Sequence, residues 1–270
     1  MSHPAGISTK GREDLTRVLK SGKRFFTPTD VALALDVDPT NAAKRLSAWA
    51  RDGWVRRARR GLYIAVPVDA SNPTAWSEDP LLVALAVWSP CYFTGWTSAN
   101  HWALTDQVFR TTVLKTAARI RKSEETLLDH DYLLRHASES ELSWGLSSEW
   151  SGGSRIHFAD RARTVIDVLD APDLAGGIRH AADILGAYLD EHDSRTLVEY
   201  GDRLGNRTVF KRLGYLTEVL GRNLPDLTTA CRERISEGVS PLDPDGPKGG
   251  RRAMRWHLRV NVTLKPESPT

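Results

Sequence analysis

Cysteines and long hydrophobic runs are scarce in this chain, which has only Cys91 and Cys231 among its 270 residues. The two cysteines form neither a zinc-ligand spacing nor a disulfide framework, so we expect inert buried thiols in a reducing compartment. The longest apolar run, residues 81–88, has eight residues and is far too short to cross a bilayer. The first ten residues lack the apolar core of a signal peptide. These absences predict a cytoplasmic protein without a membrane partner.

Catalytic motifs are also missing. The sequence contains no HExxH zinc motif, no phosphate-binding P-loop and no Gly-x-Ser-x-Gly turn. A Gly-Ser pair followed by Asp167 and Asp170 resembles a nucleotidyltransferase site, but those enzymes need two carboxylates one residue apart on a strand. Here the spacing is three on a predicted helix, so we interpret Asp167 as a helix-surface residue, and Asp129 and Asp131 as part of a solvated loop. We therefore expect no enzymatic activity, no metal site and no cofactor.

Charge is unevenly distributed, although the whole chain is only +3. Residues 1–66 carry thirteen Lys or Arg against six Asp or Glu, which is +7, so the other 204 residues sum to −4. A basic module on a mildly acidic body indicates one surface that meets a polyanion. The proline-containing segment 69–80 predicts a linker between a module at residues 1–68 and a body at residues 81–264, followed by a tail at residues 265–270.

The basic module has the sequence pattern of a winged helix-turn-helix. After a first helix within residues 11–22, Thr27 can cap a second helix that starts at Pro28. Asp38 and Pro39 offer the cap and start of a third helix, residues 40–52. This helix is expected to bury one apolar face, formed by Ala43, Leu46, Trp49 and Ala50. Residues 54–66 then predict two short strands around an arginine-rich turn.

Two helices followed by a basic hairpin are suited to duplex DNA, because one element enters the major groove while another lies along the backbone. Asn41, Lys44 and Arg45 are the candidates for reading base edges. The hairpin arginines are candidates for phosphates or a minor groove. The predicted DNA-binding residues are Thr40, Asn41, Lys44, Arg45, Arg51, Arg56, Arg57, Arg59 and Arg60. The alternative is a solvated, charged hairpin on an ordinary small helical domain.

The body has a mixed pattern, so the predicted fold class is α+β: a winged helix-turn-helix followed by a larger mixed α/β domain. Helices are predicted at residues 79–88, 98–104, 159–169, 177–189, 195–204, 208–220 and 227–235. Strands are predicted at residues 111–116, 132–136, 155–158 and 254–262. Apolar residues alternate with polar ones in the last segment, which predicts a strand that returns to an earlier sheet.

A second basic group lies in the helical region of the body. Its members are Arg203, Arg207, Lys211, Arg212 and Arg222. Three of them are four residues apart and would line one face of an unbroken helix, although Gly205 opposes an unbroken helix. Such a face could dock an acidic partner or flanking DNA. The alternative is a solvated helix surface.

Several segments together resemble the AbiEi-type antitoxins of type IV toxin–antitoxin systems, over roughly residues 12 to 264. The segments are residues 53–67, 92–104, 159–169, 210–221 and the final strand. The resemblance implies an N-terminal winged helix that represses its own operon at inverted repeats, and a C-terminal domain that opposes a nucleotidyltransferase-like toxin. It assigns the DNA-contacting role to Lys44, Arg45, Arg56, Arg57, Arg59 and Arg60.

Three functional hypotheses follow from these patterns. The first is a non-enzymatic autorepressor and antitoxin, whose partners are the double-stranded DNA of its own promoter and, functionally, the toxin. The second keeps the DNA-binding module but makes the body a sensor of a small molecule. The third makes the body a nuclease or nucleotide-handling enzyme. The absence of clustered carboxylates beside a lysine or histidine argues against the third.

Overall fold

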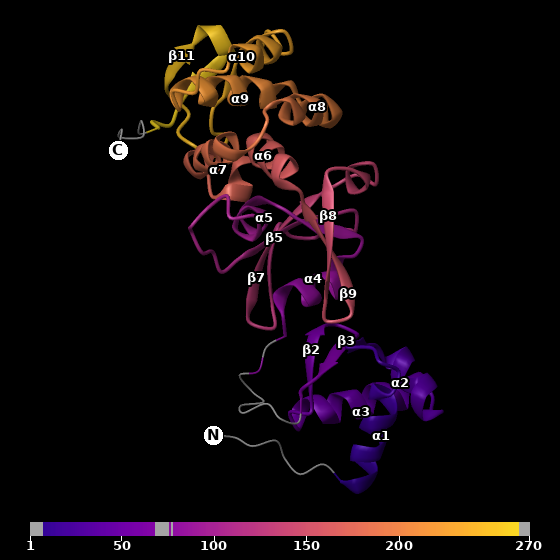
Figure 1. The fold of residues 1–270 in the computed structure, drawn as a ribbon. Coiled ribbons are helices and arrows are strands. Elements are labelled where there is room, and N and C mark those ends of the chain that lie inside the picture. The colour runs from indigo at the N-terminus through magenta and orange to yellow at the C-terminus, as the bar shows by residue number, and fades with distance from the viewer. Residues whose placement is uncertain (1–7, 68–75, 77, 265–270) are drawn as a thin grey trace. The chain divides into compact units, whose positions relative to one another are not determined.

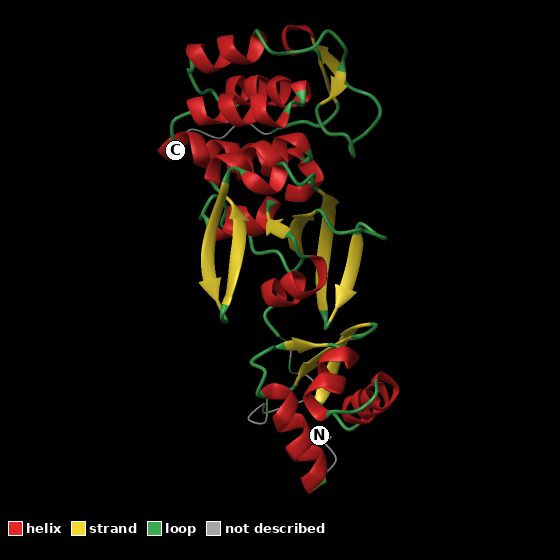
Figure 2. Cartoon of the chain, turned by 90° about the vertical axis from the view of Figure 1, so that its right-hand side faces the viewer, coloured by secondary structure: helices red, strands yellow, loops and turns green. Residues whose placement is uncertain are grey.

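The computed structural model describes residues 8–67, 76 and 78–264, and it combines helices with sheets, as predicted (Figures 1 and 2). The chain divides into two compact units. The N-terminal unit comprises residues 1–87 and 126–131, and the C-terminal unit comprises residues 88–125 and 132–270. Most of the predicted linker at residues 69–80, and the whole predicted tail at residues 265–270, lie outside the described residues.

The N-terminal unit packs helices against a small antiparallel sheet (Figure 1). Its elements are α1 (Thr9–Leu19), β1 (Phe25–Phe26), α2 (Pro28–Leu35), α3 (Pro39–Arg51), β2 (Val55–Arg59) and β3 (Leu62–Ala65). The strands lie in the order β1-β3-β2. Side chains of all these elements share one apolar core, which includes Val18 of α1, Val31 of α2 and Leu46 of α3.

Local capping explains where α2 and α3 begin. The Thr27 hydroxyl accepts a hydrogen bond from the Asp30 backbone N–H at 3.2 Å, and the Asp30 carboxylate accepts one from the Thr27 N–H at 2.8 Å. This reciprocal capping box satisfies two free amides at the start of α2. Asp38 caps α3, so both predicted helix starts are confirmed. The buried face of α3 contains Ala42 rather than the predicted Ala43.

A six-stranded sheet organises the C-terminal unit (Figures 1 and 2). Its strands are β4 (Cys91–Phe93), β5 (Thr112–Thr116), β6 (Glu124–Leu127), β7 (His130–His136), β8 (Leu146–Ser151) and β9 (Ser154–Ala159). They lie in the order β6-β7-β5-β4-β9-β8. The sequence predicted β5, β7 and β9, but not the other three, because β4 is only three residues long and β6 and β8 are mostly polar.

Helices form a layer beyond one end of this sheet (Figure 2). They are α5 (Gly95–His101), α6 (Arg161–Asp170), α7 (Ile178–Glu191), α8 (Arg195–Leu204), α9 (Arg207–Val219) and α10 (Pro225–Arg232). The helix before the sheet in the chain is α4 (Pro80–Trp88), whose residues 80–87 belong to the N-terminal unit. The apolar faces of α5 to α10 form a common core, in which Val165 and Leu169 of α6 and Leu213 of α9 are fully buried. No helix formed by the described residues is long and apolar enough to cross a membrane.

The last described segment forms a separate small sheet rather than joining the large one. Its strands pair in the order β10 (Ser240–Pro241), β12 (Leu258–Val260) and β11 (Arg251–Ala253). The predicted continuous strand over residues 254–262 is therefore wrong, and so is its return to an earlier sheet. Met254–Trp256 forms a 3-10 turn, because the Trp256 indole packs against Gly214 of α9, where a Cβ would lie 2.1 Å from the ring. His257 then adopts a left-handed conformation with a φ of 48°.

Charged side chains form a buried network between α6 and the large sheet. Asp167 is fully buried, and its Oδ1 accepts hydrogen bonds from Lys115 Nζ at 2.9 Å and Arg163 Nε at 3.0 Å. Its Oδ2 accepts from Thr94 Oγ1 at 2.7 Å and Tyr92 Oη at 3.0 Å. The interpretation of Asp167 as a helix-surface residue is therefore wrong. Burial opposes its ionisation, but the charges of Lys115 and Arg163 outweigh burial and lower its pKa.

Replacing Asp167 by Asn should lower the free energy of unfolding by about 3–5 kcal/mol, because two buried cations lose their counter-charge. Chemical denaturation measures this loss. Since folding lowers the pKa of Asp167, its contribution is complete above the ordinary value of 3.8 and is lost as the pH falls through the folded-state pKa. The stability difference between Asp167→Asn and the parent should therefore shrink in acid.

A surface carboxylate provides the control for this variant. Asp202 pairs with Arg234 at 2.9 Å, and about half of its side chain is exposed. Because solvent screens such a pair, Asp202→Asn should change the free energy of unfolding by less than about 1 kcal/mol. An Asp167→Asn loss no larger than that of Asp202→Asn would contradict the proposed importance of the buried network.

Candidate nucleic-acid interface

Three cations project from the β2–β3 hairpin of the N-terminal unit. Arg57, Arg59 and Arg60 are exposed, whereas Ala58 is buried. A shift of the strand register between Arg57 and Arg59 allows this, because the extra residue of a bulge breaks the alternation of a strand. Gly61 closes the turn with a φ of 79°, a conformation that suits glycine best. The predicted arginine-rich hairpin is therefore present, with three guanidinium groups in solvent.

The exposed side of α3 carries a further cation, Lys44. The helix starts six residues earlier, where Asp38 Oδ1 accepts hydrogen bonds from the backbone N–H groups of Thr40 and Asn41 at 2.9 and 3.0 Å. The bond from the Asn41 N–H lowers the pKa of the Asp38 carboxyl. The Asn41 side-chain amide also donates to Asp38 Oδ2 at 2.5 Å. Asn41, a predicted base-reading residue, is therefore engaged in the cap, while Thr40 and Lys44 remain exposed.

Arg45 and Arg56 are held by carboxylates of their own unit. Arg45 Nη1 donates to Oδ2 of Asp14, a largely buried residue of α1. Arg56 Nη2 donates to Asp129 Oδ2 at 2.8 Å, and its Nη1 donates to the carbonyl oxygen of Trp76. These two carboxylates lie 31 and 73 residues away from the arginines in sequence, too far for a local sequence pattern to indicate the pairing. Both arginines therefore brace the unit instead of presenting free charges.

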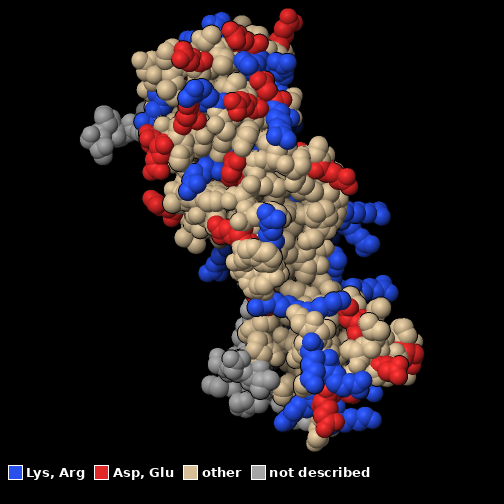
Figure 3. All heavy atoms as spheres, turned by 45° about the vertical axis from the view of Figure 1, so that its right-hand side comes forward, with Lys and Arg blue, Asp and Glu red and all other residues tan. Residues whose placement is uncertain are grey.

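The remaining cations of the predicted interface are available to a ligand. Lys44, Arg57, Arg59 and Arg60 form no ion pair with any residue that the structure describes. Arg51 lies beside Asp52, with 3.2 Å between Nε and Oδ1, but 78% of its side chain is exposed. Figure 3 shows Lys and Arg side chains gathered over the N-terminal unit, whereas positive and negative side chains alternate over the C-terminal unit. Exposed positive charge of this density attracts polyanions.

The second basic group does not form the predicted surface. Gly205, with a φ of 80°, ends α8, so α8 and α9 are separate helices. Lys211 and Arg212 are only 1% and 3% exposed. Arg212 donates to the carbonyl oxygens of Leu169 at 2.7 Å and Leu242 at 3.0 Å, while Lys211 donates to that of Gly238. Buried charges need fixed hydrogen-bond acceptors, and backbone carbonyl oxygens supply them here. Lys211 and Arg212 therefore hold neighbouring backbone segments together in the interior of the unit.

The outer members of this group have other surroundings. Arg222 pairs with Asp190 at 2.7 Å, and the guanidinium of Arg203 lies 5.1 Å from the centre of the Trp144 ring. Arg207 is exposed and donates to the carbonyl oxygen of Arg234 at 3.0 Å. The five side chains thus serve different local contacts and do not line one helix face.

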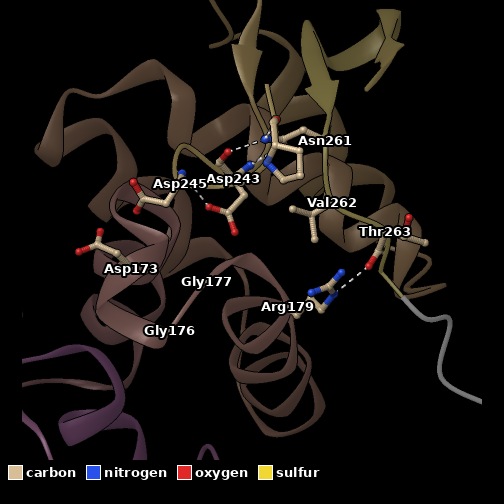
Figure 4. Close-up of a pocket in the computed structure, with 11 residues that line it drawn as sticks. Asp173, Gly176, Gly177, Arg179, Asp243, Asp245, Asn261, Val262 and Thr263 are labelled. Carbon is tan, nitrogen blue, oxygen red and sulfur yellow. Dashed lines mark hydrogen bonds between the residues drawn. The ribbon is translucent and has the colours of Figure 1, made fainter. Parts of the chain in front are cut away.

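A polar cavity of about 600 Å³ lies in the C-terminal unit (Figure 4). Asp173, Asp243 and Asp245 line one side of it, and Arg179 lines the other. Asp243 Oδ2 accepts a hydrogen bond from the Ile178 backbone N–H at 3.0 Å and so caps α7. Arg179 Nε donates to the Thr263 carbonyl oxygen at 3.0 Å. Asp173 accepts a hydrogen bond from Arg135, so three of the four charged groups of the lining already have partners within the unit.

Neither a metal-ligand cluster nor a reactive thiol is found among the described residues. No three His, Cys, Asp or Glu side chains of residues 8–67, 76 and 78–264 are grouped as the ligands of a metal ion. Cys91 and Cys231 are both buried, as predicted. Burial raises the pKa of each thiol to about 12, which keeps both protonated and unreactive at neutral pH.

The basic N-terminal segment matches a known protein family. Residues 13–66, from within α1 to the end of β3, match the family model described as "Transcriptional regulator, AbiEi antitoxin". The match covers 54 of the 270 residues and concerns this segment alone. The resemblance drawn from the sequence is thereby confirmed for these residues, and the match supports the general role of a transcriptional regulator of antitoxin type. The family description names no catalysed reaction.

A solved structure resembles the whole chain. It is the crystal structure of the RV2827C protein from Mycobacterium tuberculosis, with a TM-score of 0.64 and 13% sequence identity. The match covers 94% of this chain and 92% of the other. At this identity the likeness concerns the fold alone. A search of curated proteins finds no match to this chain.

We expect Asp14 and Arg45 to stabilise the AbiEi segment through each other. Asp14→Asn and Arg45→Gln should each lower the free energy of unfolding, because each leaves a partly buried partner unpaired. The double variant should lose less than the sum of the two, with a coupling energy of about 1 kcal/mol for a partly exposed pair. Denaturation of the parent, both single variants and the double variant measures this coupling.

Lys44→Gln is the matched control, since it removes one positive charge from the neighbouring exposed position of α3. It should leave the free energy of unfolding within about 0.5 kcal/mol of the parent. Zero coupling between Asp14 and Arg45, or equal damage from Lys44→Gln and Arg45→Gln, would contradict a bracing role for Arg45.

Proposed function

We propose that this chain is a DNA-binding transcriptional autorepressor and the antitoxin of a type IV toxin–antitoxin operon. Its N-terminal unit acts as a winged helix-turn-helix that binds double-stranded DNA of its own promoter at inverted repeats. Its antitoxin activity opposes a nucleotidyltransferase-like toxin. The AbiEi match over residues 13–66 supports the general role.

The order of elements supports a winged helix. The chain turns between α2 and α3 within three residues, helped by the left-handed conformation of Asp36, whose φ is 54°. The β2–β3 hairpin follows α3 directly. In helix-turn-helix proteins the second helix of the motif lies in the major groove, with its N-terminal residues at the base edges. In this chain that helix is α3, and the hairpin is the wing.

The observation that carries the proposal is a set of four cations that form no ion pair within the described part of the N-terminal unit. Lys44 is exposed near the start of α3, where its ammonium can donate to guanine O6 and N7. Arg57, Arg59 and Arg60 extend from the hairpin and suit phosphates. Arg45 braces α3 from behind through Asp14. In this proposal α3 recognises the DNA bases, and the β2–β3 hairpin contacts the phosphate backbone.

The triple substitution of Arg57, Arg59 and Arg60 by Gln should weaken binding to promoter DNA across all sequences. If each arginine meets one phosphate, the slope of log K against log salt should become shallower by about 2.7, because each lost contact removes about 0.9. Fluorescence anisotropy with a labelled promoter duplex at several salt concentrations measures the slope. If the triple variant binds as tightly as the parent, the hairpin arginines do not contact the DNA and this part of the proposal is wrong.

Lys44→Gln provides the contrast on the same DNA. It should relax the preferred base at one position of each half-site, with a discrimination loss of about 1–3 kcal/mol, while changing the salt slope by about one unit or less. Selection from a randomised duplex library reads the preference directly. An unchanged preference would show that α3 does not read bases through Lys44.

The antitoxin half can be tested in cells. Co-expression of the full chain with the nucleotidyltransferase-like protein encoded beside it should restore growth that the toxin alone arrests. The triple wing variant should still restore growth when both genes are driven by foreign promoters, because repression is then irrelevant. Failure of the parent chain to restore growth would refute the antitoxin role and leave the repressor role standing.

A second candidate function is small-molecule sensing by the C-terminal unit. Its support is the 600 Å³ cavity of Figure 4, whose volume is in the range of ligand pockets. A ligand-induced rise in the thermal midpoint of the full chain would be its signature. The repressor and antitoxin proposal is better supported, because the cavity has few apolar lining groups.

A further inference from the structure

The C-terminal unit has a concentrated positive segment inside a negative body. Residues 246–264 contain no Asp or Glu. Their five basic residues are Lys248, Arg251, Arg252, Arg255 and Arg259. The rest of this unit carries nineteen Lys or Arg against twenty-three Asp or Glu, a net charge of −4. The positive charge of the unit is therefore concentrated in one segment, which is where a polyanion is attracted most strongly.

The small sheet holds this segment in an ordered form. Leu258 of β12 is fully buried, and Trp256 is 1% exposed with its Nε1 donating to Glu218 Oε2 at 2.6 Å. The Asn261 amide donates to the carbonyl oxygens of Asp243 at 2.7 Å and Pro247 at 2.9 Å, which ties the preceding loop to β12. Gly250 permits the close approach of this loop, since a Cβ would lie 2.3 Å from the Val260 carbonyl oxygen.

The basic side chains of the segment face away from this anchored side. Lys248, Arg251 and Arg252 are exposed and form no ion pair with any described residue. Arg255 is 54% exposed and pairs with Glu218 at 2.9 Å, so it contributes less free charge. The first three residues are within five positions of one another along an extended loop and strand. Their charges are thus spread over a surface rather than collected around one point.

Two arginines lie directly opposite each other in this sheet. Arg252 of β11 and Arg259 of β12 are partners in the antiparallel ladder. Like charges at opposed positions have Cβ atoms about 5 Å apart and destabilise a sheet. The Arg259 Nε–H is also enclosed without a hydrogen-bond partner among the residues that the structure describes. An anion bound beside the two guanidinium groups would relieve their repulsion, while the Arg259 Nε–H stays enclosed.

We infer that this arginine surface, defined by Lys248, Arg251, Arg252 and Arg259, binds the phosphate backbone of duplex DNA beside the operator. The inference rests on the proposed DNA-binding function and adds a second contact region to it. A spread of cations without a pocket suits a chain of phosphates better than a single phosphate. The contact carries no base recognition, since the guanidinium and ammonium groups meet only phosphate oxygens.

Tethering is the reason why duplex DNA is the favoured occupant. Three or four exposed cations on a negative body bind a free polyanion weakly. Once the N-terminal unit holds the operator, flanking phosphates are present at high effective concentration around the rest of the same chain. Weak contacts of this kind then add affinity without any new recognition. An unlinked RNA or an acidic protein has no such advantage.

The full chain with Lys248→Gln, Arg251→Gln and Arg252→Gln tests the inference. Two duplexes are compared by fluorescence anisotropy: the footprinted operator alone, and the operator with about 20 base pairs added on each side. The parent should bind the longer duplex more tightly and with a steeper salt slope. The variant should lose about tenfold in affinity on the longer duplex, with a slope shallower by about 2.7, and should match the parent on the short one.

A charge-matched control separates a local contact from a general effect of net charge. Arg119→Gln, Arg121→Gln and Lys122→Gln remove three exposed cations from another loop of the same unit. This control should bind both duplexes as the parent does. The variant with Lys248, Arg251 and Arg252 replaced by Gln should have a thermal unfolding midpoint equal to that of the parent or higher. The reason is that Arg252→Gln removes the repulsion between Arg252 and Arg259.

Each contrary outcome has a defined meaning. Equal losses for both triple variants, or no loss on the longer duplex, would overturn the inference while operator binding by the parent keeps the proposed function intact. A loss of binding to a structured RNA but not to flanked DNA would overturn it in favour of RNA. Failure of the parent to bind either duplex would overturn the proposed function, and the inference with it.

Discussion

Charge pairing within the chain decides which of its cations can meet a ligand. A guanidinium beside a carboxylate is already compensated, and moving it to a phosphate exchanges one partner for another with little gain. Arg45 forms an ion pair with Asp14, and Arg56 forms one with Asp129. These two arginines of the basic module therefore stabilise the fold. Lys44 and the hairpin arginines have no such partner among the described residues, and they form the candidate interface. The distribution of acids thus shapes this surface as much as the distribution of bases.

The same residue types have the opposite role inside the C-terminal unit. Lys115 and Arg163 surround Asp167, and Arg212 binds carbonyl oxygens where α6 ends and the small sheet begins. A buried cation is tolerated only with fixed acceptors, so these side chains lock elements that are distant in sequence. The network joins α6 to β4 and β5, and Arg212 joins α9 to the loop at Leu242.

The proposed function uses the two units in different ways. The N-terminal unit concentrates free charge on a helix and a hairpin, which allows specific contact with a duplex. The C-terminal unit is negative apart from its last sheet, which allows only a local and non-specific contact. If both contacts occur on one DNA, the first supplies register and the second adds affinity that depends strongly on salt. In this proposal, the surface of the C-terminal unit outside the small sheet is free to serve the antitoxin role.

Local signals in the sequence determined the elements of the N-terminal unit. Thr27 and Asp38 with their following prolines mark helix starts, and Gly61 marks the hairpin turn, because caps and tight turns depend on residues within a few positions. The long helices of the C-terminal unit were predicted for the same reason, from their apolar periodicity. The family resemblance was also readable over residues 13–66, where it is confirmed.

Only the tertiary structure decided what the charged residues do. Asp167 looked like a surface residue, and Lys211 and Arg212 looked like part of a basic face, because most of their partners are 27 to 75 residues away in sequence. The last segment alternates like a strand, yet Trp256 leaves that pattern to pack on Gly214. Periodicity encodes which side chains avoid water, whereas electrostatic pairing depends on distances that exist only after distant segments have packed together.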